Sequence, residues 1–211
     1  MVVSLRETRL PGEWFQRDVV TVARDLIGTV LVYKQRAGVI VETEAYLGPE
    51  DKASHTRFGV TARNSVMYGP GGVAYVYLCY GIHEMFNIVT GEDGQGQAVL
   101  VRAIAPYAGI VDDPDIGRGP GKVTTAMAID RSLDRRSLTK GSLYVAAHVD
   151  APALTAWAKA PARSIATGPR VGVEFAGDDW SARPLRFWWN DHPSVSGSRA
   201  RATTLSTRRK R

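Results

Sequence analysis

The sequence predicts one α+β domain built on a largely antiparallel, curved sheet with flanking helices and a protruding β-hairpin. Three observations support this fold class. The chain has 211 residues, which suits a single filled core. Two pairs of strand segments are separated by only a few residues, as in hairpins. The strand segments do not alternate regularly with helices, so parallel βαβ units are not expected.

The first half of the chain is predicted to contain one helix and two strand pairs. Apolar residues recur at helical spacing over residues 12–28, and Gly28 supplies a stop signal. Runs rich in β-branched residues follow, and a later strand pair surrounds a turn that contains Gly81. The strands expected in this half span 29–33, 38–47, 73–80 and 85–90.

The second half is predicted to return to strands around one further helix. Segment 98–104 is expected to be a strand that carries Arg102 among apolar neighbours. A loop rich in glycine and proline, 114–122, opens a helix at 123–129. The remaining strands are expected at 142–149, 170–175 and 185–189.

Composition excludes several classes of protein. Charged residues make up 23% of the chain and hydrophobic residues 44%, which is ordinary for a globular domain. Charged side chains interrupt the N-terminal segment, and no apolar span approaches the roughly 18 residues of a membrane helix. Cys79 is the single cysteine, and no Cys/His cluster has zinc-ligand spacing. We therefore expect a cytoplasmic protein without a metal, a cofactor or a membrane association.

The body of the chain is neutral, although the whole chain has a net charge of +6. Six of the 27 basic residues lie in residues 196–211, which contain no acid, and this leaves 21 basic and 21 acidic residues elsewhere. We divide the chain into a domain at 1–196 and a basic, flexible tail at 197–211. Two interpretations of the tail stay open: a solubilising extension, or a tether that attracts DNA phosphates regardless of sequence.

The strand expected at 38–47 carries the first candidate chemistry. Its period of two puts Ile40, Glu42, Glu44 and Tyr46 on one face and an apolar set on the other. Two carboxylates on one face repel each other and raise one another's pKa, so a purely structural strand rarely has them. A carboxylate held there is a candidate general base. A solvated outer face is the alternative interpretation of this strand alone.

Three aromatic or imidazole side chains follow soon after. His55 lies in the loop after the strand, and Tyr77 and Tyr80 belong to the aromatic hairpin segment AYVYLCYGIHEMFN. Each of these residues on its own is typical of packing or of an exposed surface. Their occurrence close to the two carboxylates favours a shared site.

Seven separated motifs resemble the alkyladenine, or 3-methyladenine, DNA glycosylase family. They occur in the family's order from about Thr8 to Ser196, and an accidental match of all seven is improbable. The motifs are ETEAYLGPEDKASH, MYGPGG, AYVYLCYGIHEMFN, VLVRAIAP, GRGPGKVTTAMAI, RVGVE and PLRFWWNDHPSVS.

The resemblance implies a hydrolase that removes damaged purines from double-stranded DNA. Glu44 matches the family's general base, which deprotonates the water that attacks C1′ of the extruded nucleotide. Arg102 matches the arginine that positions this water and nucleotide. From the sequence alone, a structural ion pair of Arg102 with Glu42 or Glu44 is the ordinary expectation. We favour a combination, in which Arg102 orients the catalytic carboxylate and approaches the substrate phosphate or the water.

The resemblance also assigns the base pocket. Tyr46, His55 and Tyr77 match the residues that hold the purine, with the two phenols on its faces. Asn87 matches the residue that screens against the exocyclic amine of guanine. The family's substrates are 3-methyladenine, 7-methylguanine, hypoxanthine and ethenoadenine, and this sequence does not rank them.

The expected contacts to duplex DNA lie on the hairpin and one loop. Tyr80 matches the wedge that fills the gap left by the extruded nucleotide, and Gly81 and Ile82 lie beside it. Such wedges approach DNA from the minor groove. Lys122, at the start of the expected helix 123–129, is a candidate phosphate contact, although a simple capped loop explains it equally well. We expect the protein to act as a monomer.

Other functions stay open from the sequence. A non-catalytic protein that binds damaged DNA would keep the wedge and the aromatics without needing Glu44. A bifunctional glycosylase with a lyase step requires an amine nucleophile, and the motif strands contain no lysine. A small-molecule transferase on a related sheet would leave the wedge hairpin unexplained.

Overall fold

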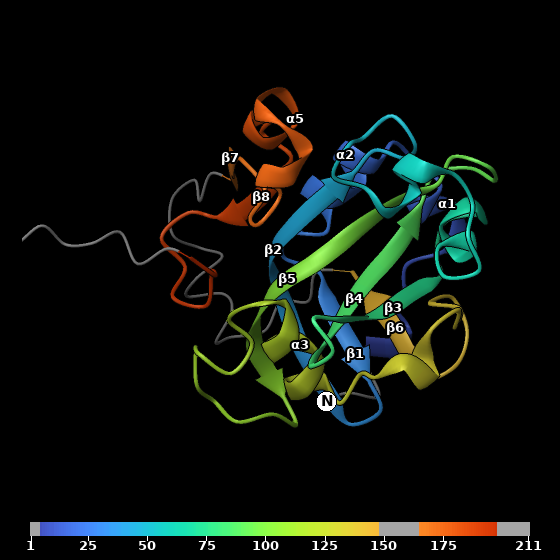
Figure 1. Ribbon diagram of the computed structural model, residues 1–211. Helices are drawn as coiled ribbons and strands as arrows, with labels where there is room; N and C mark the ends of the chain where they lie inside the picture. The colour runs from blue at the N-terminus through green and yellow to red at the C-terminus, as the bar shows by residue number, and fades with distance from the viewer. Residues whose placement is uncertain (1–4, 148–164, 198–211) are drawn as a thin grey trace, which may run out of the picture.

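The computed structural model of the protein describes residues 5–147 and 165–197. In this part of the chain, eight antiparallel strands form one curled sheet, with short helices at its faces and edges (Figure 1). The strands are β1 (Val30–Tyr33), β2 (Arg36–Tyr46), β3 (Ala74–Cys79), β4 (His83–Thr90), β5 (Gln97–Ala108), β6 (Leu143–Ala146), β7 (Ile165–Gly168) and β8 (Arg186–Trp189). The predicted α+β fold class is confirmed.

Strand β2 is the branch point of the sheet. The strand order is β3-β4-β5-β2-β1-β6, and β8 also pairs with β2, over Glu42 to Glu44. The pairing of β2 with β5 shifts register on both sides of Glu42. Such β-bulges are frequent beside active sites, where they redirect side chains. The irregular part of β2 is therefore centred on Glu42, two residues before Glu44.

The first predicted helix was wrong in its continuity. Residues 12–28 form two helices, α1 (Gly12–Phe15) and α2 (Val19–Asp25), because Asp18 starts a new helix between them. Its carboxylate accepts the backbone N–H of Thr21 at 2.8 Å, as a helix N-cap does. The apolar stripe of this segment still packs into the core.

The second predicted helix is confirmed with an earlier start. It is α3 (Pro120–Met127), and Pro120 suits its first turn because proline lacks the N–H that this position leaves unpaired. The helix ends at Ala128 in the left-handed conformation. Further short helices were not predicted: α5 (Asp178–Ala182), η2 (His55–Phe58), η3 (Ser65–Tyr68), η4 (Arg131–Leu133) and η5 (Glu174–Ala176).

The strand predicted at 170–175 was also wrong. The strand in this region is β7, and residues 170–173 lead without regular structure into the short helix η5. The segment turns at Gly172, whose φ of +74° favours glycine. Its polar groups bond to the site residues described below. The other predicted strands are present with shifted ends, and residues 148–149 and 198–211 lie outside the described residues.

The hydrophobic core lies between the sheet and the helices α2 and α3. It includes Phe15, Leu26 and Val41, all fully buried, and α3 packs on β4 and β5. On β2, which also carries Val41, Thr43 faces α2, and its hydroxyl donates to the carbonyl of Ala23 at 2.7 Å. No helix among the described residues has both the length and the apolar character needed to cross a membrane.

Candidate active site

The carboxylate of Glu44 is fully buried and surrounded by hydrogen-bond donors. Its Oε1 accepts the backbone N–H of Val171 at 2.7 Å and lies 3.3 Å from Nη1 of Arg102. Its Oε2 accepts the hydroxyl of Tyr46 at 3.0 Å. The alternative of a solvated outer face is wrong, because both acids of this strand are fully buried.

Burial and pairing act on Glu44 in opposite directions. Desolvation raises the pKa of this carboxyl, while Arg102 and the two hydrogen bonds lower it, and the net direction is upward. Burial also lowers the pKa of Arg102, but the two glutamates outweigh this effect and raise it. Arg102 therefore stays charged beside a carboxylate whose proton affinity is increased, as suits a general base.

The second acid, Glu42, is held by a separate set of donors. Nε of Arg102 donates to it at 3.2 Å, and Nε of Arg186 lies 3.0 Å from the same oxygen. Ser196 donates its backbone N–H at 2.6 Å and its hydroxyl at 3.0 Å. Arg102 thus pairs with both glutamates, whereas the sequence predicted a pair with one or the other. Glu42 fixes the guanidinium, while Glu44 stands nearer the aromatic groups.

Three rings, those of His55, Tyr75 and Tyr77, pack against one another. His55 on η2 and Tyr77 on β3 lie with their ring centroids 4.5 Å apart, and Tyr75 lies 5.2 Å from Tyr77. The Nδ1 atom of His55 and the hydroxyl of Tyr75 are 2.8 Å apart and share a hydrogen bond. Burial, with Arg63 and Arg57, lowers the pKa of His55 to about 4, so its imidazole is neutral at physiological pH.

These groups line a cavity of about 450 Å³, which is in the range of small-molecule sites. Tyr46, His55, Tyr77 and Arg102 all face it, and so do Val171 and a set of apolar side chains. Glu44 lies directly behind this lining, bonded to three of the lining residues. Three of the predicted pocket residues and both predicted catalytic residues therefore converge.

Asn87 is the fourth predicted pocket residue, and it faces Tyr75 across the hairpin. The two are register partners on β3 and β4, and Nδ2 of Asn87 donates to the carbonyl of Tyr75 at 3.2 Å. This bond directs the amide nitrogen to the protein backbone. The side chain lines the cavity and is nearly fully buried.

The tip of the β3–β4 hairpin carries the predicted wedge. Tyr80 is 90% exposed and Ile82 is 73% exposed, and Tyr80 also borders the cavity. Tyr80 and Gly81 both have positive φ, +51° and +73°, within a turn closed by the N–H of Ile82 on the carbonyl of Cys79. Glycine adopts this conformation freely, but a tyrosine is strained there. Strain at an exposed aromatic residue points to a functional requirement.

Lys122 stands apart from the cavity. Its Nζ donates to the carbonyl of Asp115 at 3.1 Å, and it borders a separate hollow together with Arg118 and Gly197. Pro120, two residues earlier, is the part of this helix that reaches the cavity. The phosphate contact predicted for Lys122 stays a prediction.

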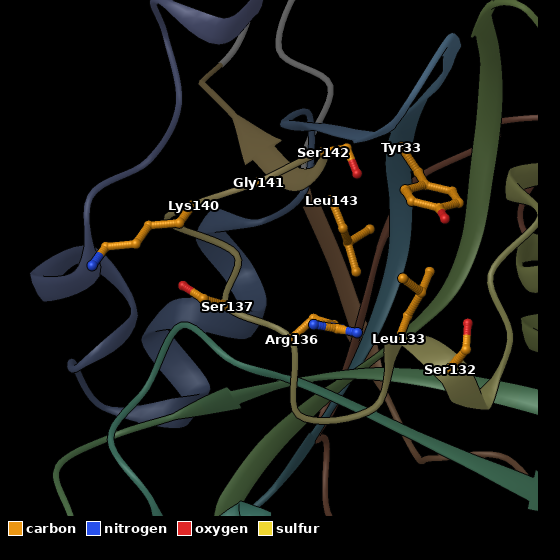
Figure 2. Close-up of a pocket in the computed structure, with 9 residues that line it drawn as sticks. All are labelled: Tyr33, Ser132, Leu133, Arg136, Ser137, Lys140, Gly141, Ser142 and Leu143. Atoms are coloured by element: carbon orange, nitrogen blue, oxygen red, sulfur yellow. The ribbon is translucent and has the colours of Figure 1, made fainter.

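Another hollow, of about 510 Å³, has none of this chemistry. Figure 2 shows it beside Tyr33 on β1 and Leu143 on β6, with the loop that follows η4 around it. Its charged lining residues are Arg136 and Lys140, and none of the candidate site residues faces it. The aromatic cavity is therefore the better candidate site.

Sequence reasoning missed several residues of the site. Tyr75 shares a face of β3 with Tyr77, so strict period-two reading of the hairpin would have found it. The N–H of Val171 was not foreseen because backbone groups leave no trace in the residue type. Arg170 and Ser196 reach the site from distant segments, and only the tertiary structure brings them there.

Comparison with known proteins identifies the class of protein that this fold and site define. It is a DNA glycosylase, a hydrolase of N-glycosyl bonds that acts on alkylated bases in DNA repair. The chain belongs to the methylpurine-DNA glycosylase family, whose model matches residues 13–193.

Curated relatives agree with this assignment, and each carries the name "Putative 3-methyladenine DNA glycosylase". The protein from Myxococcus xanthus is 42% identical over 191 residues, 89% of this chain and 93% of the relative. The protein from Anaeromyxobacter dehalogenans strain 2CP-1 is 46% identical over 193 residues, 89% of this chain and 85% of the relative. The protein from Methanoculleus marisnigri is 44% identical over 199 residues, 89% of this chain and 98% of the relative.

Proposed function

We propose that the protein extrudes a damaged purine nucleotide from double-stranded DNA and hydrolyses its N-glycosidic bond with a water activated by Glu44. The observation that carries this proposal is the placement of a buried, donor-surrounded carboxylate directly behind an aromatic cavity. The arrangement combines a general base with a pocket that suits a flat ring system. A binding module that performs no chemistry has no need of the carboxylate.

Glu44 has two tasks in this mechanism. Deprotonated, it accepts a proton from the water that attacks C1′. Its negative charge also stabilises the oxocarbenium-like sugar that forms as the bond to the base breaks. The N–H of Val171 and the hydroxyl of Tyr46 fix the orientation of both carboxylate oxygens. Arg102 lowers the pKa of this carboxyl and so opposes the upward shift that desolvation causes.

The aromatic residues serve recognition. Every purine has a π-face, and stacking contributes about 1 to 3 kcal/mol per base, so rings such as Tyr77 and Tyr46 accept many modified purines. Extrusion costs a few kcal/mol and is easiest for weakened base pairs, which favours damaged sites. Tyr80 on the hairpin offsets that cost by filling the vacated space from the minor-groove side. The protein acts as a monomer in this scheme.

Single-turnover base release is the decisive experiment. Duplexes containing hypoxanthine or ethenoadenine are incubated with excess wild-type protein and with Glu44→Gln. We expect release by the wild type, and loss of release by at least about a hundredfold in the variant, as for other general bases. Glu44→Gln should still bind the lesion duplex. Near-normal turnover by this variant would remove Glu44 from its role, and binding without release by the wild type would favour the non-catalytic alternative.

A trapping experiment separates hydrolysis from a lyase mechanism. A bifunctional glycosylase forms an imine between an amine and the sugar, which borohydride reduces to a stable adduct. No lysine lines the described cavity, so we expect base release without a trapped protein–DNA adduct. Efficient trapping would show that an amine, and not water, attacks the sugar.

A further inference from the structure

Two exposed phenyl rings flank Arg57 at the edge of the aromatic cavity. Phe58, at the end of η2, is 82% exposed, and Phe175, on η5, is 64% exposed. Large apolar side chains exposed together usually mark an interaction surface. Phe175 also lines the cavity, so this surface is continuous with the candidate active site.

Arg57 connects the two rings. Its guanidinium carbon lies 4.5 Å from the ring centroid of Phe58 and 5.0 Å from that of Phe175. Within the described residues, no carboxylate pairs with Arg57, and no group accepts a hydrogen bond from its side chain. An arginine that rests on aromatic rings keeps its forked N–H groups available, and this fork matches a phosphate.

The position of Arg57 relates it to the nucleotide. It follows His55 by two residues on the same short helix, and both side chains line the cavity. Tyr80 borders the cavity from the hairpin, and Figure 1 shows α5, which follows η5, well separated from the β3–β4 turn. The hairpin with Tyr80 and the region of η5 and α5 thus form two separate sides. If a nucleotide enters the cavity between them, the DNA backbone on either side of that nucleotide has to pass over one of them.

We propose that Arg57, supported by Phe58 and Phe175, binds a phosphate of the damaged strand beside the extruded nucleotide. The proposal rests on the proposed function and adds a second DNA contact to the hairpin wedge. With the base in the cavity and C1′ near Glu44, the flanking phosphates have to lie at the cavity mouth. The rings hold the guanidinium there and pack against the sugar. Arg63, which lies over the ring of Tyr77 and also lines the cavity, adds to the positive charge around it.

The test measures DNA binding directly. A fluorescent duplex carrying a tetrahydrofuran abasic analogue serves as the probe, because it retains the phosphates and cannot be hydrolysed. Loss of one charge-assisted phosphate contact should raise the Kd of Arg57→Gln about tenfold. The slope of log K against log salt should fall by about one, as expected for one lost phosphate contact. Arg57→Lys should keep the wild-type salt slope but bind more weakly, because lysine lacks the fork.

Arg9→Gln is the matched control. Arg9 also rests on an aromatic ring, 4.3 Å from the centroid of Tyr144, but it does not line the cavity. The substitution removes the same charge, so an unchanged Kd and salt slope show that net charge alone is not responsible. If Arg57→Gln binds as Arg9→Gln does, the proposed contact is refuted, and the aromatic surface serves another partner. Base release by the wild type is scored separately, and its absence would count against the proposed function and not against Arg57.

Discussion

Arg170 and Asp51 form an ion pair in which both side chains are fully buried, and the guanidinium also lies over the ring of Tyr46, 4.8 Å from its centroid. Nη2 of Arg170 donates to Oδ1 of Asp51 at 2.9 Å. Asp51 in turn accepts backbone N–H bonds from Leu47 and Ala53. The pair therefore ties the end of β2 to the loop before η2 and to the segment after β7. Two of these segments supply Glu44, Tyr46 and the N–H of Val171 to the candidate site.

Breaking this pair should destabilise the fold. Asp51→Asn leaves a buried guanidinium without its counter-ion, and such a change lowers the free energy of unfolding by about 3 to 5 kcal/mol. Urea unfolding measures the loss. Asp179→Asn is the control, since it removes an exposed pair with Arg183 and should cost less than about 1 kcal/mol. Equal effects of the two substitutions would show that burial does not strengthen the inner pair.

Base release should depend on pH through Glu44. The deprotonated carboxylate is the active form of a general base, so the single-turnover rate rises with pH through its pKa and then levels off. Burial raises this pKa, and the midpoint should therefore lie above the ordinary value of 4.5. The pKa of His55 is lowered to about 4, so this imidazole titrates at the acid end of the range.

The rate at saturating protein, measured between about pH 4 and pH 8, tests this expectation. Tyr46→Phe provides a second reading, because it removes a hydrogen bond that lowers the pKa of Glu44. Its midpoint should move to higher pH. A wild-type midpoint at or below 4.5, or a downward shift in Tyr46→Phe, would contradict the assignment.

The hairpin turn should trade stability for function. Tyr80 has a φ of +51°, which asparagine tolerates better than tyrosine. Tyr80→Asn should raise the free energy of unfolding by up to about 1 kcal/mol. The same substitution removes the stacking ring, so base release at subsaturating protein should fall about tenfold. Val111→Asn, at another exposed apolar residue, should alter neither quantity. A Tyr80→Asn variant that releases bases normally would exclude the wedge.

The strands and the acids of this site were predictable because they follow local rules. The period of two in β2 correctly separated Glu44 from Thr43, despite the irregular register around Glu42. The hairpin was visible from its aromatic runs and from Gly81. These features depend on residues that are neighbours in sequence.

The segment after β7 was not predictable, because distant contacts decide its structure. Residues 170–175 have the composition of a strand, yet the side chain of Arg170 is drawn to Asp51, and the N–H of Val171 donates to Glu44. A strand would have used these backbone groups for pairing. Tertiary polar contacts therefore override the local preference in the segment that completes the site.

The charge of the C-terminal tail supports a last prediction. Residues 197–211 contain six basic side chains and no acid, while the rest of the chain is neutral. Each basic residue that neutralises a phosphate contributes about 0.9 to the slope of log K against log salt, so deletion of the tail should lower that slope by up to about five. Binding to an undamaged duplex, measured over roughly 50 to 200 mM salt, provides the slope.

A variant that replaces the six basic side chains with glutamine at unchanged length separates charge from mere presence of the tail. If the tail is a tether, the neutral variant should match the deletion, because counterion release requires the charges and not the chain. Base release from a lesion duplex at saturating protein should stay at the wild-type level in both variants. The reason is that Glu44, Arg102 and the aromatic cavity belong to residues 44–175 and not to the tail. An unchanged salt slope in both variants would assign the tail to solubility, and would leave the DNA affinity of this protein to its folded domain.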